Sequence, residues 1–114
     1  MEIKLRRSST IYIVDIIGEM DLYNAFKLKD VLKKMIQKNI RHYIINLDQV
    51  EYLDSSGIGA LIYAHSELKK RKMLLRIVNI KGSVKKVIEL TKLIGYFHIA
   101  QDVPEGIRQI KQQV

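Results

Sequence analysis

The hydrophobic and polar positions of this chain repeat with two periods, and these periods predict where strands and helices lie. Alternating residues and short β-branched runs indicate strands, whereas apolar residues three or four positions apart indicate helices. We expect strands over residues 3–7, 11–17, 42–47, 74–78 and 96–99. Helices are expected from Asp21 to the break at Asn39, from Ser56 to about Lys70, from Ser83 to Gly95, and after Asp102.

Each expected helix begins near a short polar side chain, which can accept a hydrogen bond from a backbone N–H of the first turn. These caps are Asp21, Ser55 or Ser56, Ser83 and Asp102. The first expected helix has one apolar face and one face rich in lysine, so its apolar face should pack on a sheet. In the third expected helix, Leu90 and Ile94 should widen the apolar stripe, and Gly95 should end the helix.

The order of these elements predicts an α/β fold. Only three polar residues, 8–10, separate the first two strands, which should therefore form an antiparallel hairpin. The later strands alternate with helices, and such crossovers pair strands in parallel with a right-handed connection. We expect a single domain over residues 1–114, with a mixed sheet of about five strands and about four α-helices.

Composition narrows the class of protein without changing this fold. With 47% hydrophobic and 28% charged residues, the chain is typical of a soluble globular domain. It has no cysteine, which excludes a disulfide framework and a thiolate site. The longest apolar run, residues 11–17, is interrupted by Asp15 and is far shorter than the roughly 20 residues that span a bilayer. Because no signal-peptide pattern is present either, we expect a cytoplasmic protein without a membrane span.

The formal net charge of +8 is the one unusual property of the composition, and it suggests an anionic partner. Nucleic acid or an anionic membrane surface would fit, but the lysines are spread over every expected helix and are not interleaved with exposed aromatic residues. We therefore interpret them mainly as solvated helix faces that speed association with an acidic protein. No direct nucleic-acid partner is expected, and binding that falls steeply with added salt would contradict this interpretation.

The most informative stretch is Val50–Leu61, where an expected strand passes into a helix through Asp54-Ser55-Ser56-Gly57. The start of a helix has unpaired N–H groups and the positive end of the helix dipole, so a phosphate there would be stabilised. Gly57 and Gly59 flank Ile58 and allow another backbone or a partner protein to approach closely. From these residues alone, helix capping with packing glycines is the simpler interpretation, and a phosphate-accepting hydroxyl is the alternative.

The sequence lacks the groups that catalysis or metal binding needs. Its three histidines, His42, His65 and His98, have no ligand spacing and no cysteine partners, so we interpret them as strand or helix-face residues. Gly57-Ile58-Gly59 lacks the third glycine of a dinucleotide fingerprint, and no Gly-Lys-Ser/Thr loop or Gly-x-Ser-x-Gly elbow occurs. We expect neither an enzyme nor a cofactor or metal site.

The Asp54-Ser55-Ser56-Gly57 turn resembles the signature of the STAS domain, the module of sulfate transporters and of bacterial anti-sigma factor antagonists. The similarity is best to the single-domain antagonists. It extends to the Gly-Glu-x-Asp pattern at residues 18–21 and to the segment at residues 84–90. The resemblance therefore implies a STAS-type fold, whose order of elements agrees with the predicted one.

The resemblance also implies a regulatory switch. In such antagonists, a serine of the turn is phosphorylated by the anti-sigma factor, a serine kinase that uses ATP. A metal-dependent serine phosphatase removes the phosphate again. The unphosphorylated form binds the anti-sigma factor and releases the sigma factor for transcription. The resemblance assigns the acceptor to Ser56, with Ser55 as second choice. It assigns the partner-binding surface to Asp21, Asp54, Ser55, Ser56, Gly57, Ile58 and Gly59.

A second interpretation within the same family is a non-catalytic STAS scaffold subunit of a stress-signalling or transporter complex. Some such subunits lack a usable acceptor residue, and the presence of one in this chain favours the switch. A pull-down from the native cell, read by mass spectrometry, would identify which sigma factor, kinase and phosphatase are involved.

Overall fold

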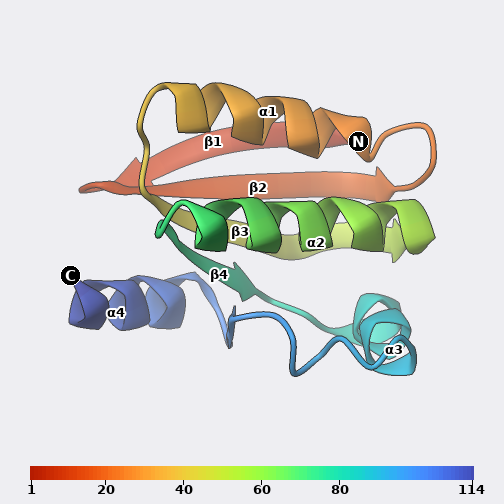
Figure 1. Ribbon diagram of the computed structural model, residues 1–114. Coiled ribbons are helices and arrows are strands. Elements are labelled where there is room, and N and C mark those ends of the chain that lie inside the picture. Colours follow the sequence, from red (N-terminus) through yellow and green to blue (C-terminus); the bar gives the residue numbers. More distant parts are fainter.

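A five-stranded sheet with the order β1-β2-β3-β4-β5 forms the frame of the protein, as seen in a computed structural model that describes residues 1–114 (Figure 1). The strands are β1 (Glu2–Ser8), β2 (Ile11–Met20), β3 (His42–Leu53), β4 (Leu74–Val78) and β5 (Ile99–Ala100). The four helices are α1 (Phe26–Gln37), α2 (Ser55–Lys70), α3 (Gly82–Leu90) and α4 (Val103–Gln113).

Strand pairing follows the order of the chain. β1 and β2 form the predicted antiparallel hairpin, in which Glu2 lies opposite Ile17 and Ser8 lies opposite Ile11. Every later pair is parallel, β2 with β3, β3 with β4 and β4 with β5, as helical crossovers require. The predicted α/β fold with a mixed sheet is therefore confirmed, and β4 occupies the predicted residues 74–78.

The strands β2 and β3 are longer than the sequence predicts. β2 continues beyond residue 17 to Met20, and β3 continues beyond residue 47 to Leu53. The two extensions pair with each other after two register shifts, so that Glu19 lies opposite Tyr52 and Met20 opposite Leu53. Exposed polar residues interrupt the apolar pattern in both extensions, and the main-chain ladder holds them together across these irregularities.

Helices cover both faces of the sheet. α1 and α2 lie side by side on one face, and α4 lies on the other (Figure 1). Neighbouring residues of β3 mark this division, because successive side chains of a strand point to opposite faces. Ile45 belongs to the larger core beneath α1 and α2, whereas Ile44 belongs to a smaller core that includes Ile110 of α4.

Asp102 caps its helix as predicted, but Ser83 does not. Asp102 accepts a hydrogen bond from the N–H of Glu105 at 3.0 Å. The N-cap position of α3 is Lys81, so Ser83 lies inside the first turn. There the Ser83 hydroxyl donates instead to the carbonyl oxygen of Glu51, at 3.4 Å, and ties α3 to the extended part of β3.

The third helix also ends earlier than predicted. It stops at Leu90, not at Gly95, because Lys92 adopts a left-handed conformation with φ of 61°. Leu90 and Ile94 therefore do not widen the buried stripe, and 82% and 38% of their surfaces are exposed. The last strand is displaced from residues 96–99 to the two residues of β5. No helix has the length and hydropathy that crossing a membrane would require.

Candidate functional site

The turn between β3 and α2 is organised by the carboxylate of Asp54. Its Oδ1 accepts hydrogen bonds from the N–H of Ser56 at 2.8 Å and from the N–H of Gly57 at 3.2 Å. Asp54 is therefore the N-cap of α2, and neither Ser55 nor Ser56 caps it as expected. A carboxylate is favourable here, because it satisfies two unpaired N–H groups and faces the positive end of the helix dipole.

The same carboxylate also fixes the loop that follows β2. Its Oδ2 accepts a hydrogen bond from the N–H of Leu22 at 3.2 Å. The N–H of Asp54 donates to the carbonyl oxygen of Met20 at 3.3 Å. The loop after β2 and the start of α2 are thus held as one unit, although they are distant in the sequence.

The glycines of the turn have two different roles. A Cβ on Gly57 would collide with the carbonyl oxygen of Met20 and would lie 2.6 Å from Cδ1 of Leu53, so only glycine fits there. A Cβ on Gly59 would meet no atom within 4 Å. The close approach expected of these glycines therefore occurs at Gly57, between the helix start and the end of β2.

Exposure divides the predicted partner-binding residues into two groups. Gly57 and Ile58 are buried, and they contribute to the packing beneath the turn. Ser55 is exposed, while the remaining members are half-buried at the surface; these are Asp21, Asp54, Ser56 and Gly59. The two hydroxyls occupy the first two positions of α2, as the sequence predicted for Ser56.

Asp21 belongs to this unit but does not cap α1. Its Oδ1 accepts hydrogen bonds from the N–H of Tyr23 at 3.0 Å and from the N–H and side-chain amide of Asn24 at 3.1 and 2.9 Å. These bonds close a separate turn before the helix, which begins at Phe26 with Ala25 in the N-cap position. The prediction that Asp21 caps the helix is therefore wrong, because an aspartate can equally stabilise a local turn.

Large apolar side chains lie exposed on the segments around this turn. The exposed fractions are 69% for Leu22, 80% for Tyr23, 55% for Phe26 and 50% for Tyr52. We call these four residues the exposed apolar group. They were not expected from the sequence, although Leu22 and Tyr23, which directly follow Asp21 and fall outside the buried helical stripe, were a usable signal. Such a group beside polar, hydrogen-bonded backbone is typical of a protein-binding surface.

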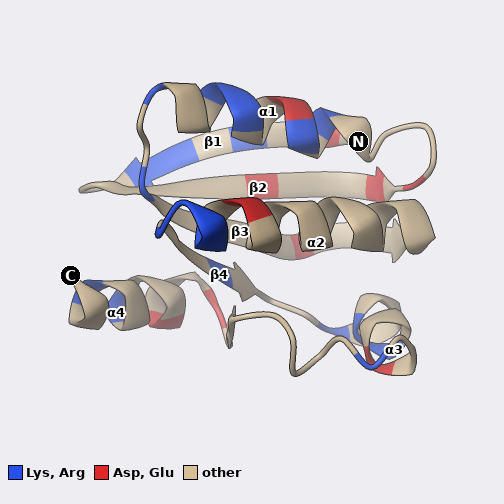
Figure 2. Cartoon of the chain, in the orientation of Figure 1, with Lys and Arg blue, Asp and Glu red and all other residues tan.

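Charge is unevenly distributed around the site. Figure 2 shows Lys and Arg on β1, on the outer side of α1 and at the C-terminal end of α2, whereas the N-terminal part of α2 carries neither sign of charge. Asp21 and Asp54 lie at that N-terminal end. The turn itself therefore presents hydroxyls, apolar groups and two carboxylates.

Two of the three histidines come together at a different place. The ring centroids of His65 on α2 and His98, just before β5, are 4.8 Å apart. Burial lowers the pKa of both rings, and neighbouring positive charge, including that of Lys69, lowers each pKa further. His42 lies apart from them and bonds to the hydroxyl of Thr10 at 3.0 Å. No three His, Cys, Asp or Glu side chains gather as a metal site would require.

Comparison with known proteins gives a consistent result over most of the chain. The family model described as STAS domain matches residues 2–106. An anti-sigma-B factor antagonist of Staphylococcus aureus is 28% identical over 99 residues, which are 87% of this chain and 92% of that protein.

Solved structures agree with the topology described above. An anti-sigma factor antagonist from Mycobacterium paratuberculosis superposes with a TM-score of 0.87 at 20% identity, over 96% of this chain and 93% of that one. The Bacillus cell fate determinant SpoIIAA in its phosphorylated form superposes with a TM-score of 0.74 at 19% identity, over 96% and 99% of the two chains. At this level of identity, the likeness shows that the fold is shared.

Proposed function

The chain belongs to the STAS domain family, and on that premise we propose that it is an anti-sigma factor antagonist controlled by phosphorylation of Ser56. The observation that carries the proposal is the position of this serine. It lies half-buried on the first turn of α2, directly beside the loop that Asp54 holds in place. A modification at Ser56 would therefore act at the centre of the candidate surface.

Unphosphorylated, this surface suits a protein partner with an apolar patch. The exposed apolar group provides apolar area, and its removal from water would favour association. The hydroxyls of Ser55 and Ser56 and the small residue Gly59 add no bulk or charge at the start of α2. An anti-sigma factor could thus approach the helix closely, with Gly59 leaving room on the outside.

Phosphorylation would change this surface by charge more than by shape. A phosphate on Ser56 adds roughly −1.5 to −2 beside the carboxylate of Asp54. The N–H groups of Ser56 and Gly57, which were expected to be unpaired, already donate to Asp54. The added charge must therefore be met by solvent or by the partner. Against an apolar wall or a like charge, the loss of affinity would be roughly a hundredfold or more.

The partners in this cycle follow from the proposed function. The anti-sigma factor, a serine kinase that uses ATP, would phosphorylate Ser56, and a serine phosphatase of the metal-dependent type would restore the hydroxyl. The chain would act as ligand and substrate, not as catalyst, in the cytoplasm with the transcription machinery. The name of the Staphylococcus aureus relative supports an anti-sigma factor as the partner.

The proposal is tested by incubating the chain with its anti-sigma factor and Mg-ATP and locating the phosphate by mass spectrometry. We expect modification of Ser56, abolished in Ser56→Ala and retained in the matched control Ser55→Ala. A phosphate found on Ser55 would instead identify Ser55 as the acceptor. An unmodified turn in a chain that co-purifies with scaffold or transporter subunits would instead favour the scaffold interpretation.

A further inference from the structure

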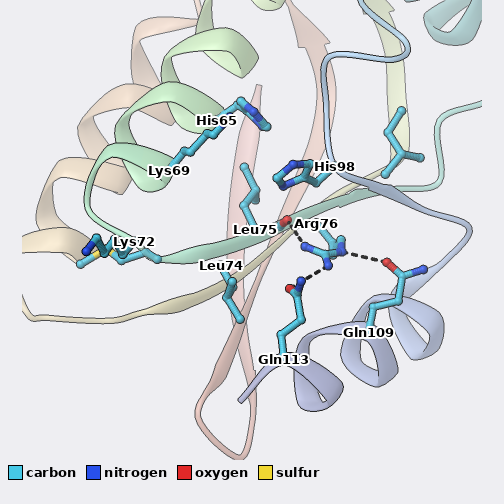
Figure 3. Close-up of a pocket in the computed structure, with 11 residues that line it drawn as sticks. His65, Lys69, Lys72, Leu74, Leu75, Arg76, His98, Gln109 and Gln113 are labelled. Carbon is cyan, nitrogen blue, oxygen red and sulfur yellow. Dashed lines mark hydrogen bonds between the residues drawn. The ribbon is translucent and has the colours of Figure 1, made fainter.

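A cavity of about 560 Å³ opens at the edge of the sheet, and we propose that it binds a small phosphate monoester (Figure 3). The cavity exists because β5 is short: it pairs only with Ile77 and Val78, so residues 74–76 of β4 have no neighbouring strand on that side. The second half of α2 and the helix α4 border this gap from opposite faces of the sheet. Its volume lies within the usual range for small-molecule sites.

Arg76 is the central group of the cavity. Only 9% of its surface is exposed. Its guanidinium donates to the side-chain oxygens of Gln109 at 2.8 Å and Gln113 at 2.9 Å, and to the carbonyl oxygen of Leu75 at 2.9 Å. All three acceptors are neutral. The guanidinium is thus a largely buried charge held in place without a counter-ion, and an anion in the cavity would supply one.

The neutral partners hold the guanidinium in a defined orientation. Gln109 donates its side-chain N–H to Glu105 at 3.4 Å, which turns its amide oxygen toward Arg76. A guanidinium has five N–H donors, and the bonds to protein use one on each nitrogen. One N–H therefore remains on Nη1 and one on Nη2, and each can donate to an oxyanion.

Further positive and donor groups line the same cavity. His65 and Lys69 reach it from α2, and His98 lies between them and Arg76 (Figure 3). Lys72 is at the far edge of the cavity in this view. No aspartate or glutamate is among the lining residues. The pKa of His98 is lowered by burial and then by the nearby positive charges of Arg76 and Lys69.

The open strand edge adds a backbone donor. The N–H of Leu74 donates to the carbonyl oxygen of Arg41, on the β3 side of β4, at 2.9 Å. Because backbone groups alternate along a strand, the N–H of the next residue, Leu75, points to the opposite, unpaired edge. The cavity therefore offers N–H donors from side chains and from backbone together.

This combination of groups selects the ligand class. Donors and positive charges without a carboxylate match an oxyanion, and a phosphate dianion offers more charge and more acceptor oxygens than a carboxylate. The cavity is much larger than a phosphate ion, and its lining includes the apolar side chains of Leu74 and Ile99. We therefore assign it to a phosphate attached to a small organic group. This assignment does not depend on the function proposed for Ser56.

The first test uses the wild-type chain and NMR titration of its histidines. Phenyl phosphate and inorganic phosphate should both raise the pKa of His65 and His98, because an anion relieves their repulsion from Lys69 and Arg76. His42, outside the cavity, reports changes unrelated to the site. Acetate should have an effect at least several-fold weaker. Equal effects of acetate and both phosphates, or none at about 10 mM phosphate, would overturn the proposal.

The second test compares variants by calorimetry with phenyl phosphate. Arg76→Gln should weaken binding by about tenfold or more, because it removes the two available N–H groups and the charge. Lys69→Gln should weaken binding, whereas Lys70→Gln should not; the two changes remove the same charge from adjacent positions, and Lys70 does not line the cavity. If Arg76→Gln fails to fold, the comparison of Lys69→Gln with Lys70→Gln decides whether the cavity binds the probe. Equal affinity of both lysine variants for the probe would contradict the assignment.

Discussion

The carboxylate of Asp54 and the N–H of Leu22 are joined by a hydrogen bond of 3.2 Å across 32 residues of sequence. This bond links the first turn of α2 to a residue of the exposed apolar group. Since the other carboxylate oxygen caps the helix, one side chain positions both parts of the candidate surface. Asp54 is thus a structural support for the surface as well as a member of it.

Asp54→Ala should be more destabilising than the loss of an ordinary helix cap. It removes acceptors for Leu22, Ser56 and Gly57, whereas the control Asp102→Ala removes the acceptor for Glu105 alone. We expect a cost of about 2–3 kcal/mol for Asp54→Ala and about 1 kcal/mol for Asp102→Ala. Urea denaturation measures both values. Equal costs would show that the bond to Leu22 contributes nothing.

Gly57→Ala and Gly59→Ala should have opposite effects on stability. A methyl group on Gly57 would collide with the backbone of Met20, so we expect a loss of at least about 2 kcal/mol. Gly59 has open space around it and lies inside α2, so alanine there should stabilise the helix by about 0.5–1 kcal/mol. The two variants carry the same added methyl group. Thermal melts of both therefore test directly whether Gly57 is needed for the close packing against Met20.

Ser56→Asp should weaken binding to the anti-sigma factor by roughly a hundredfold or more while the chain stays folded. The first turn of a helix tolerates an added negative charge, so the melting curve should remain close to that of the wild type. Ser56→Ala should bind normally. Ser55→Asp places the same charge one residue earlier and should have a smaller effect. Calorimetry that finds Ser56→Asp as tight as the wild type would exclude the switch.

Stability should fall as the pH drops below about 6.5, the ordinary pKa of histidine. The folded-state pKa values of His65 and His98 are lowered, by burial first and then by nearby positive charge. The unfolded chain therefore binds protons at higher pH than the folded chain, and stability decreases until the pH lies below both folded-state values. Denaturation between about pH 7.5 and pH 5, in buffer free of phosphate, measures this slope. A smaller slope of stability against pH in His98→Gln would assign the pH dependence to His65 and His98.

Tyr43→Phe should not destabilise the protein, although Tyr43 is fully buried in the core. Its hydroxyl has no hydrogen-bond partner, and burial raises the pKa of the phenol to about 12 despite the opposing charge of Arg71. Removing an unsatisfied buried hydroxyl is neutral or stabilising by up to about 1–2 kcal/mol. The exposed Tyr23→Phe is the control. A clear loss of stability in Tyr43→Phe alone would mean that the hydroxyl finds a partner in solution.

Periodic patterns were sufficient to predict the order of strands and helices, because each element buries one face in the core. Residues 74–78 form a buried strand at the predicted boundaries for this reason. The helix start at Asp54-Ser55-Ser56-Gly57 was also predictable, because a strand pattern passes into a helical period there and short polar residues lie at the junction. Which of these three polar residues accepts the hydrogen bonds from the first turn of α2 depends on the exact path of the chain.

Contacts between distant segments were not predictable from the pattern. Asp21 and Asp54 are both aspartates before a helix, yet Asp21 closes its own turn while Asp54 caps α2. His65 on α2 and His98 just before β5 are 33 residues apart in the sequence, and only the tertiary packing brings their rings together. Arg76 likewise reads as a strand residue in the sequence, and its neutral partners on α4 emerge only from the packing of that helix.

The agreement between the order of strands in the sheet and their order in the chain bears on how the protein is made. As β3 leaves the ribosome, its partner β2 has already been synthesised, and the same holds for β4 on β3 and for β5 on β4. Each of these strands pairs with one that has already been synthesised, and each loop that closes has only moderate length. Each new strand can therefore pair as soon as it is made, always at the same growing edge of the sheet. That edge is the one that later forms the cavity, where growth stops after the two residues of β5.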